Sequence, residues 1–471
     1  MIVHEARRRV VVAALVSAAG FAAIEAFLWG FTVDDALITA RVATHLANGL
    51  GHRFNSDGPV VDAVTPLGFA HLLSLFAHFA GGDPWRTMYF AKWFGAACGL
   101  GAAALVGGAV ALASGDKVRF AALLPFVCSA PLAAWCVSGM ETGLVVLLAT
   151  VAVVSSGPRS AAAAGVAAAL RPELVPWSAT LALFASLAEG SGSRRASAFA
   201  LAWALGPAIG VALVRLVVFG HPAPLAVWAK PSDAAHGAWY AAACLIWTGA
   251  PVLVIATRSL GSIDGKSRAV LVASLAHVAA LVLAGGDWMA LFRLFVPVLP
   301  GLVVVGARIA GVAPRLWTAA RVGVATGVSL LLLFDKGPEA RHIGEQRAAL
   351  IDDARALLAG SHAVASLDVG WVGTAFPGRV VDLAGVTDET VARLPGGHTS
   401  KRVPPSMLEH RGVDTLVFLT EGPKGEDAAS LRYSRAVEAR LVQQMELVPR
   451  AFIELRGTSQ RYVVLRVRNG S

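Results

Sequence analysis

Charged residues are scarce in this chain. Only 15% of the 471 residues are Asp, Glu, Lys or Arg, whereas 56% are hydrophobic, and the mean hydropathy is +0.63. Soluble domains carry about a quarter charged residues. The composition therefore excludes an ordinary soluble protein and predicts a protein with many membrane spans.

Several kinds of site also lack their usual residues. The four cysteines lie in apolar stretches without metal-ligand spacing, and the twelve histidines form no His-x-x-His or His-x-x-x-His pair. A dedicated zinc site is therefore not supported. No Walker-type glycine loop is present, so ATP-driven transport has no motif behind it.

The charges that are present are unevenly distributed. From Asp335 onward the chain has 18 Lys and Arg and 17 Asp and Glu, which leaves 22 and 14 for the first 334 residues. We predict a membrane region over 1–334 and a soluble domain over 335–471. Most of the net charge of +9 lies in the membrane region, where Lys and Arg are expected in cytoplasmic loops, so nucleic acid is not needed to explain it.

The first apolar stretch, Val10–Gly30, is long enough to cross a bilayer, and we interpret it as a retained anchor rather than a cleaved signal. Arg7, Arg8 and Arg9 precede it and are expected to stay cytoplasmic. The adjacent carboxylates Asp34 and Asp35 then emerge on the outer face, at the start of a first outer loop over 31–65. This loop carries a helical stripe of apolar residues.

With the first span included, we predict about eleven spans in the membrane region. A further segment at 66–80 either crosses the membrane or re-enters it. After the first span, the apolar stretches are 93–113, 119–137, 142–156, 161–170, 174–187, 196–219, 237–257, 269–284, 294–310 and 316–334. If 66–80 does not cross, the basic loops become cytoplasmic and the soluble domain lies outside, which is the arrangement we prefer. These loops hold Lys117 and Arg119, Arg159, Arg194 and Arg195, Arg258–Arg268, and Arg308–Arg315. If 161–187 is one helix and 66–80 crosses, Glu141 lies inside instead.

The final domain is predicted to be a small α/β domain, because strand-like and helix-like stretches alternate. The strand-like stretches are 363–367, 379–383, 415–419, 452–455 and 462–467, and the helix-like stretches are 345–358 and 431–445.

Asp34 and Asp35 are the leading candidates for chemistry. Two neighbouring carboxylates can act as a general base for a hydroxyl, hold a divalent cation, or both. Their mutual repulsion would raise one pKa, which suits proton abstraction. The alternative is that they cap the helix that follows and complement its dipole. The residues alone do not decide between these interpretations.

Charges also interrupt apolar stretches elsewhere. Arg171-Pro172-Glu173 is either a phosphate-binding element or a turn with an Arg–Glu pair, the second being slightly favoured. Glu141 is a helix cap or a site residue, and capping is favoured. Lys230 lies in a proline-rich outer loop that is either a lid or a phosphate contact. The alternative, which is the more common case, is that Lys230 is a solvated lysine. Asp287 and Arg293 form an ion pair or line the same cavity, beside Trp288 at the interface.

Several of these residues, in this order, resemble the GT-C superfamily of membrane glycosyltransferases, most closely the polyprenyl-phosphate-sugar-dependent branch that includes the arabinofuranosyltransferases. The matching motifs cover most of the chain. They are Val33-Asp34-Asp35-Ala36 through Arg41, Asn48-Gly49-Leu50-Gly51, Phe54-Asn55, Thr65-Pro66-Leu67, 138–142, 171–173, 285–287, 381–388, 395–398 and Lys401.

The resemblance implies an inverting transfer of a sugar, arabinofuranose or another pentose or hexose, from a polyprenyl-phosphate donor. The acceptor would be a hydroxyl of a cell-envelope glycan or glycoconjugate, on the outer face of the cytoplasmic membrane. It implies Asp34 or Asp35 as the base, with Asp34 preferred, and no required cofactor, although a divalent cation on the two aspartates stays open. Donor-phosphate candidates are Arg171, Lys230 and Arg293; substrate contacts are Arg41, Glu141, Glu173, Asp287, Trp288, His398 and Lys401.

Two other classes of protein remain alternatives. A transporter or flippase of a lipid-linked sugar would use the same cavity without a base. A non-catalytic assembly or receptor protein would bind no donor lipid.

Overall fold

The structure is a computed structural model that describes residues 2–113, 121–188, 193–255, 261, 263–422, 425, 427–455 and 458–468. Lys117, Arg119 and Arg258, which we expected in cytoplasmic loops, lie outside these residues. The chain divides into two compact units. Unit 1 comprises 1–31, 91–213 and 232–342, and unit 2 comprises 32–90, 214–231 and 343–471.

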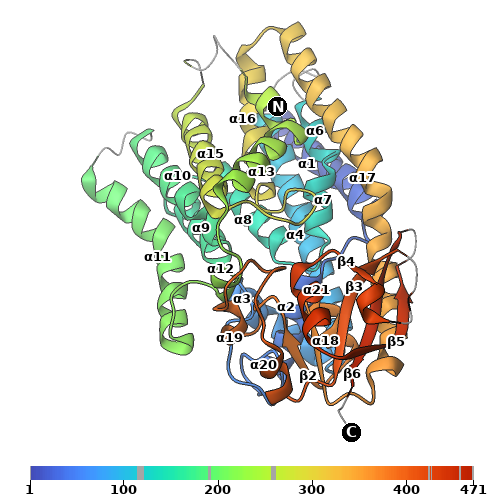
Figure 1. Cartoon of the computed structure of the whole chain (residues 1–471). Helices are drawn as coiled ribbons and strands as arrows, with labels where there is room; N and C mark the ends of the chain where they lie inside the picture. Colours follow the sequence, from blue (N-terminus) through green and yellow to red (C-terminus); the bar gives the residue numbers. More distant parts are fainter. Residues whose placement is uncertain are drawn as a thin grey trace. The chain divides into compact units, whose positions relative to one another are not determined.

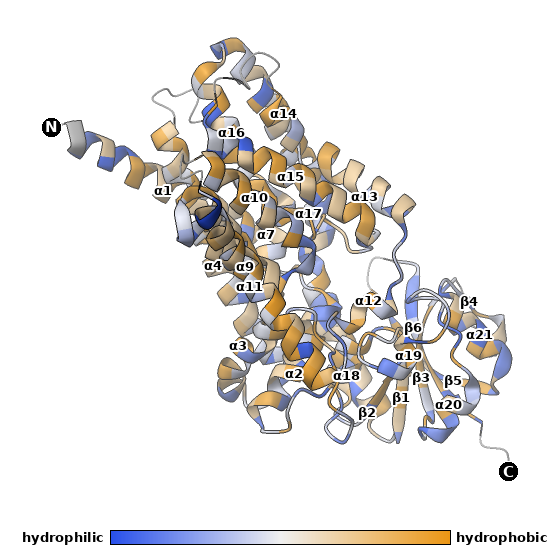
Figure 2. Cartoon of the chain, turned by 90° about the vertical axis from the view of Figure 1, so that its left-hand side faces the viewer, coloured by the Kyte–Doolittle hydropathy of each residue, from blue (hydrophilic) through white to orange (hydrophobic). Residues whose placement is uncertain are grey.

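Five described helices are long and apolar enough to cross a membrane. They are α1 (Ile2–Phe27), α4 (Pro84–Ala113), α11 (Arg194–Phe219), α15 (Gly265–Ala284) and α17 (Arg315–Leu358). Figure 2 shows that these helices are coloured mostly as hydrophobic. Large apolar side chains stand exposed along them, among them Val217 with 84% exposure and Leu316 with 85%. Such a surface is unfavourable in water and suits lipid, so the protein has the character of a membrane protein.

The other apolar helices of unit 1 have 14 residues or fewer and do not reach the length of a span. They are α7 (Ala130–Cys136), α8 (Thr142–Val154), α9 (Gly157–Leu170), α10 (Val175–Ala188), α13 (Ala234–Trp247), α14 (Ala250–Val254) and α16 (Leu299–Val312). The predicted count of about eleven spans is therefore not confirmed by helix length.

Two of the predicted spans are broken by identifiable residues. The stretch 237–257 stops at Gly249, whose backbone is left-handed at φ 65° and lies against Ala325, where a Cβ atom would find its nearest atom at 3.0 Å. The stretch 119–137 is interrupted before α7, where Ser129 accepts a hydrogen bond from the Leu132 N–H at 3.4 Å and begins a new helix.

Unit 2 begins with α2 (Asp34–Ala47) and α3 (Leu67–Ala77), which pack against each other. The segment 66–80 therefore forms α3 followed by the short η1 (His78–Ala80), and this is shorter than a membrane-spanning helix. A further short helix, α12 (Leu225–Ala229), belongs to the same unit.

The rest of unit 2 contains one mixed sheet in the order β2-β1-β3-β6-β5, with β4 on β3. Strands β1, β2 and β3 are parallel, whereas β6 pairs antiparallel with both β3 and β5. The bounds are β1 Ala363–Ser366, β2 Arg379–Asp382, β3 Thr415–Glu421, β4 Arg432–Tyr433, β5 Leu447–Glu454 and β6 Gln460–Val467. Four helices accompany it: α18 (Val369–Ala375), α19 (Glu389–Ala392), α20 (Pro405–His410) and α21 (Ala436–Gln444).

The predicted α/β domain is thus confirmed, with differences in detail: the strand expected over 452–455 begins at Leu447, and α18, α19 and α20 were not predicted. The helix expected over 431–445 begins only at Ala436, because residues 432–433 form β4. The helix expected over 345–358 is the end of α17, which runs unbroken from Arg315 and appears in Figure 1 as one long ribbon. The predicted boundary at residue 335 therefore falls inside a helix.

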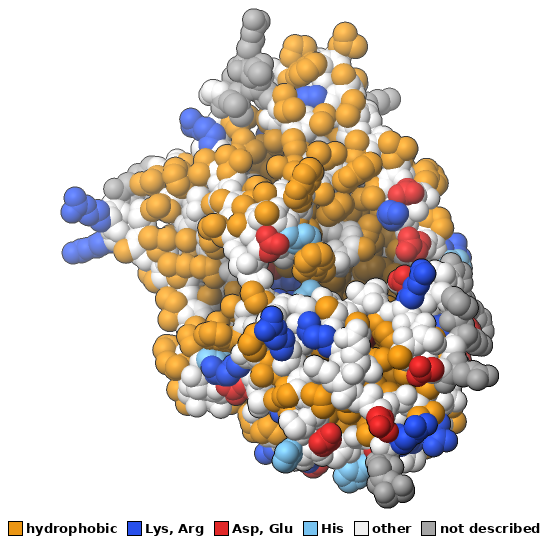
Figure 3. All heavy atoms as spheres, viewed as in Figure 1, with side chains coloured by type: hydrophobic (Ala, Val, Ile, Leu, Met, Phe, Trp, Pro, Cys, Tyr) orange, Lys and Arg blue, Asp and Glu red, His pale blue; other side chains and the backbone are white. Residues whose placement is uncertain are grey.

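The two units also differ in surface chemistry. Figure 3 shows that hydrophobic side chains cover the helices of unit 1, whereas charged side chains of both signs are spread over the sheet domain of unit 2. A core cluster of the sheet domain is built from apolar side chains on one face of the sheet, among them Leu416, Phe418 and Leu465.

Candidate functional site

Asp34 and Asp35 form the first turn of α2, but neither caps it. The N-cap residue is Val33, and no side chain caps this helix end. Neither carboxylate is therefore the N-cap residue, but both lie in the first turn, where the alternative expected them to complement the helix dipole. Asp34 instead binds a different helix of unit 2.

Asp34 receives three donors. Its Oδ1 atom lies 2.8 Å from Nη1 of Arg347 and 2.8 Å from the backbone N of Trp371, and its Oδ2 atom lies 2.7 Å from the backbone N of Gly370. The N–H groups come from the first turn of α18, so Asp34 joins α2 to α18. Burial raises the pKa of Asp34 to about 6, although Arg347 and both N–H groups act in the opposite direction.

Asp35 follows one residue later on α2, and its side chain is half-buried. Its backbone oxygen accepts a hydrogen bond from the Thr39 hydroxyl at 3.0 Å. Successive residues of a helix point about 100° apart, so Asp35 projects in a different direction from Asp34.

Arg41, predicted as a substrate contact, is buried on the same helix with 3% exposure. Its guanidinium donates to the backbone oxygens of Phe54, Phe376 and Gly378 at 2.7, 3.0 and 3.0 Å, and also to that of Gly373. These backbone oxygens accept hydrogen bonds from the N–H groups of the Arg41 guanidinium. Arg41 therefore holds the first outer loop against the segment that follows α18.

Asn55 explains another motif of this loop. Its amide nitrogen donates to the backbone oxygen of Val380 at 2.9 Å, and its amide oxygen accepts from the backbone N of Val380 at 3.0 Å. The side chain thus pairs with β2 much as a neighbouring strand would.

A buried charged group beside Asp34 was not identified from the sequence. Asp368, directly after β1, accepts two hydrogen bonds from Arg435 at 2.6 and 3.1 Å and one from the Tyr462 hydroxyl at 2.6 Å. Arg435 also lies 3.3 Å from Oε1 of Glu438. The one available signal was the position of Asp368 at the carboxyl end of a parallel strand, where sites often form.

The motif that begins at Val381 is a tight loop. Asp382 accepts hydrogen bonds from the backbone N–H groups of Ala384 and Thr387, both at 2.7 Å. Gly385 has φ 81°, and a Cβ atom there would overlap the backbone of Ala392. These residues are therefore explained by local folding.

The two predicted lysines of unit 2 differ. Lys401 is buried, and its ammonium donates to the backbone oxygens of Ala392 at 2.6 Å and Leu394 at 3.0 Å. Lys230 is half-buried, and its ammonium makes no ion pair with a described residue. His398, three residues before Lys401, is half-buried in the segment 395–400.

In unit 1 the structure brings Glu141, Arg171 and Glu173 together. Arg171 lies 2.5 Å from Oε1 of Glu141, 3.4 Å from Oε1 of Glu173 and 3.1 Å from the Thr142 hydroxyl. Glu141 is 1% exposed and occupies the N-cap position of α8, as the favoured interpretation expected, but its side chain makes no capping hydrogen bond. The Arg–Glu turn expected at 171–173 is confirmed, in the short η3 (Pro172–Leu174).

The predicted pair of Asp287 and Arg293 is also formed, with Oδ2 and Nε 2.8 Å apart. The guanidinium of Arg293 lies 5.6 Å from the ring centre of Trp135. Trp288 is 67% exposed and stacks on His236 at 3.9 Å between ring centres.

His277 was also missed by the sequence analysis. It lies buried on α15, with its ring nitrogens 3.2 Å from the backbone oxygen of Glu173 and 2.8 Å from that of Leu294. A single histidine inside an apolar helix carries no spacing signal, so only the structure shows this bridge.

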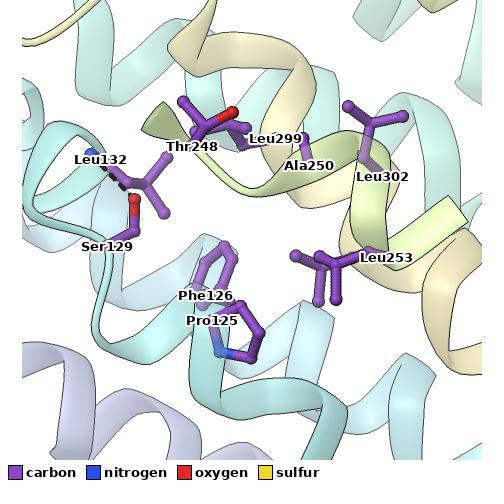
Figure 4. A pocket seen from close by; sticks show the side chains of 10 residues that line it. Pro125, Phe126, Ser129, Leu132, Thr248, Ala250, Leu253, Leu299 and Leu302 are labelled. Atoms are coloured by element: carbon purple, nitrogen blue, oxygen red, sulfur yellow. Dashed lines mark hydrogen bonds between the residues drawn. The ribbon is translucent and has the colours of Figure 1, made fainter. Parts of the chain in front are cut away.

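Unit 1 also contains a small pocket (Figure 4). Its lining is almost wholly apolar, with side chains from α7, α14 and α16 and the preceding short helix α6 (Leu124–Val127). Figure 4 shows Phe126, Leu253, Leu299 and Leu302 around it. None of the predicted site residues lines it, and no ionisable side chain does.

Metal binding finds no support among the described residues, which contain no group of three or more His, Cys, Asp or Glu side chains that could hold an ion. The predicted site residues fall into both units: the carboxylates of α2, Arg41, Lys230, His398 and Lys401 lie in unit 2, and the remaining candidates lie in unit 1. Comparison with known proteins gives no match, whether to a family model, a curated protein or a solved structure.

Proposed function

We propose that this protein is a glycosyltransferase of the GT-C type. It transfers a sugar from a polyprenyl-phosphate donor to a hydroxyl of a cell-envelope glycan or glycoconjugate, on the outer face of the cytoplasmic membrane, with inversion. The proposal includes about eleven passages through the membrane, in which shorter helices of unit 1 that follow one another in the chain cross together as broken spans. It also includes an outer location for α2 and the sheet domain.

The observation that carries the proposal is the buried charged group of unit 1. Glu141, Arg171 and Glu173 lie among apolar helices, where charged side chains are costly and usually serve a function. Oε2 of Glu141 has no hydrogen-bond donor among the described residues. A buried carboxylate oxygen without a donor is expensive unless a ligand supplies one.

A polyprenyl-phosphate sugar supplies groups that match this site. Its phosphate suits the planar guanidinium of Arg171, and of Arg293 at the neighbouring turn. A sugar hydroxyl can donate to Oε2 of Glu141. Lys230 provides a further cation in unit 2. As the bond from the anomeric carbon to the phosphate oxygen breaks, Arg171 and Arg293 stabilise the negative charge that develops on the leaving phosphate.

The acceptor hydroxyl needs a base, and we assign this role to Asp35. Asp34 already accepts from Arg347, Gly370 and Trp371, which makes it an anchor between α2 and α18. The adjacent Asp35 takes the proton while the acceptor oxygen forms its bond to the anomeric carbon. This assignment differs from the preference for Asp34 that the sequence suggested.

The test uses the purified protein in proteoliposomes with a panel of polyprenyl-phosphate sugars. The proposal expects a glycosylated acceptor and one released polyprenyl phosphate for each transfer. Movement of the intact donor between leaflets, with no release of polyprenyl phosphate, would support a flippase and contradict the proposal. Absence of donor binding would favour an assembly or receptor protein.

A further inference from the structure

His277 occupies the centre of the charged region of unit 1. It is fully buried on α15, a helix long and apolar enough to span the membrane. A polar ring in such a place requires partners. It has two, and they come from segments more than 100 residues apart in the chain: the backbone oxygens of Glu173 and Leu294.

Each partner belongs to a turn that presents an arginine. The first turn, 171–174, carries Arg171, and the second, 287–294, carries Arg293. The second turn has an unfavourable backbone, because Leu291 and Phe292 have φ of 60° and 57°, a left-handed conformation that is rare for residues with side chains. Strain of this kind persists where surrounding contacts hold it in place.

Two other contacts hold the second turn from the sides. The Tyr240 hydroxyl accepts from the backbone N of Leu294 at 3.1 Å, and the Trp135 indole donates to the backbone oxygen of Leu291 at 2.9 Å. Neither residue bonds the first turn. Among the described contacts, the ring of His277 is therefore the group whose two nitrogens lie within hydrogen-bond distance of both arginine-bearing turns.

We propose that His277 is a positioning residue that holds the Arg171 turn and the Arg293 turn in register, so that both guanidinium groups bind one phosphate of the donor. The inference rests on the proposed function for the identity of the phosphate. His277 itself touches only the two backbone oxygens. It determines how tightly the donor binds and leaves the chemical step to other residues.

The ring chemistry suggests graded variants. A backbone oxygen only accepts, so both contacts are hydrogen bonds when both ring nitrogens carry hydrogen, and a ring with one N–H keeps one. The variant His277→Gln carries its N–H donors on a single nitrogen, and its oxygen cannot bond a second backbone oxygen, so it should keep one link. His277→Ala removes both. His236→Gln is the matched control, because His236 stacks on Trp288 beside the second turn and has no contact with the first.

The first measurement is hydrogen exchange of the full chain in detergent, read by mass spectrometry. Exchange should rise in both turns for H277A and in one turn for H277Q. In H236Q the first turn and distant segments should exchange as in the wild type, because the contacts of His236 are with the second turn. Wild-type protection of both turns in H277A would overturn the positioning role. If H277A does not fold, the same reading of H277Q decides the question.

The second measurement is binding of a sugar-free polyprenyl phosphate, followed by transfer kinetics. We expect H277A to weaken binding of the polyprenyl phosphate by about tenfold or more. A tenfold change in Kd equals the free energy of about one hydrogen bond. The KM for donor should rise in parallel, while kcat at saturating donor stays within about twofold. H277A that binds as wild type overturns the inference. Wild type that binds no polyprenyl phosphate overturns the proposed function instead, while the exchange data still report on the link.

Discussion

Two of the carboxylate–arginine groups among the described residues, Asp34 with Arg347 and Glu141 with Arg171, differ in how completely their atoms are paired. In unit 2 both oxygens of Asp34 have donors, from Arg347 and two backbone N–H groups. In unit 1 one oxygen of Glu141 meets Arg171, and the other has no donor among the described residues. A fully paired group stabilises the fold, whereas an incompletely paired one is prepared for a ligand.

This comparison divides the candidate site residues, which the sequence analysis did not distinguish, into structural anchors and proposed substrate ligands. Arg41 and Lys401 are anchors because backbone oxygens take their N–H groups. Glu141, Arg171 and Lys230 are the residues that we propose for binding the substrate. The predictions below test whether anchors change stability and whether ligand groups change binding.

The largest effect is expected for Arg171→Met. The change leaves Glu141 buried without its cation, which should destabilise the protein by about 3–5 kcal/mol. Thermal unfolding in detergent measures it, with the exposed Arg159→Met as the control. In the double variant Glu141→Gln with Arg171→Met, part of the stability should return. A single variant as stable as R159M would contradict a buried ion pair.

Gly370→Ala should break the anchor in unit 2. A Cβ atom at this position would overlap the backbone oxygen of Asp34, so α18 must move away from α2. We expect a loss of about 1–3 kcal/mol, as for other overpacked sites. The control is Gly397→Ala, where the nearest atom lies at 3.5 Å and the backbone is ordinary. Equal denaturation midpoints for the two variants would show that α2 and α18 do not touch as described.

Substitution of Lys401 should lower stability, whereas substitution of Lys230 should weaken donor binding. Lys401→Met leaves the backbone oxygens of Ala392 and Leu394 without their donor and should cost about 1–3 kcal/mol. Lys230→Met should change stability by less than about 0.5 kcal/mol and weaken donor binding a few-fold. Unfolding and polyprenyl-phosphate binding are measured on both. A destabilised K230M with normal binding would reverse the assignment.

A smaller effect concerns pH. Burial raises the pKa of Asp34 to about 6, so the folded protein binds this proton more tightly than the unfolded chain does. The stability that Asp34 contributes is therefore fully present below about pH 4 and is lost as the pH rises through about 6. The stability difference between wild type and Asp34→Asn should fall over this interval. A difference that rises with pH would contradict the burial of this carboxylate.

The sequence predicted the membrane character, the α/β domain and most strands, because these follow from composition and from apolar patterns with periods of 2 and 3.6 residues. It predicted the pairs Arg171–Glu173 and Asp287–Arg293, whose members are close in the chain. It missed α18, which has no strong pattern of its own, and the continuity of α17 across 335–344, where the apolar stretch has ended and Pro338 predicts a break.

Contacts between distant segments lay beyond prediction. Nothing in the sequence near Asp34 indicates Arg347 or Gly370, more than 300 residues away. The same holds for Glu141 with Arg171, where local spacing favoured a helix cap over a tertiary ion pair. A residue type predicts what chemistry is available, but the partners that use up or leave free its hydrogen-bonding capacity come from the fold.

The central claim is tested most directly by measuring sugar transfer from a polyprenyl-phosphate donor with Asp35→Asn and Asp34→Asn side by side. Loss of a general base should lower kcat of D35N by about 10²–10⁴-fold with the donor still bound. D34N should be less stable at low pH yet keep transfer within about tenfold once folded. Full transfer by D35N, or selective loss of transfer in a stable D34N, would contradict the account.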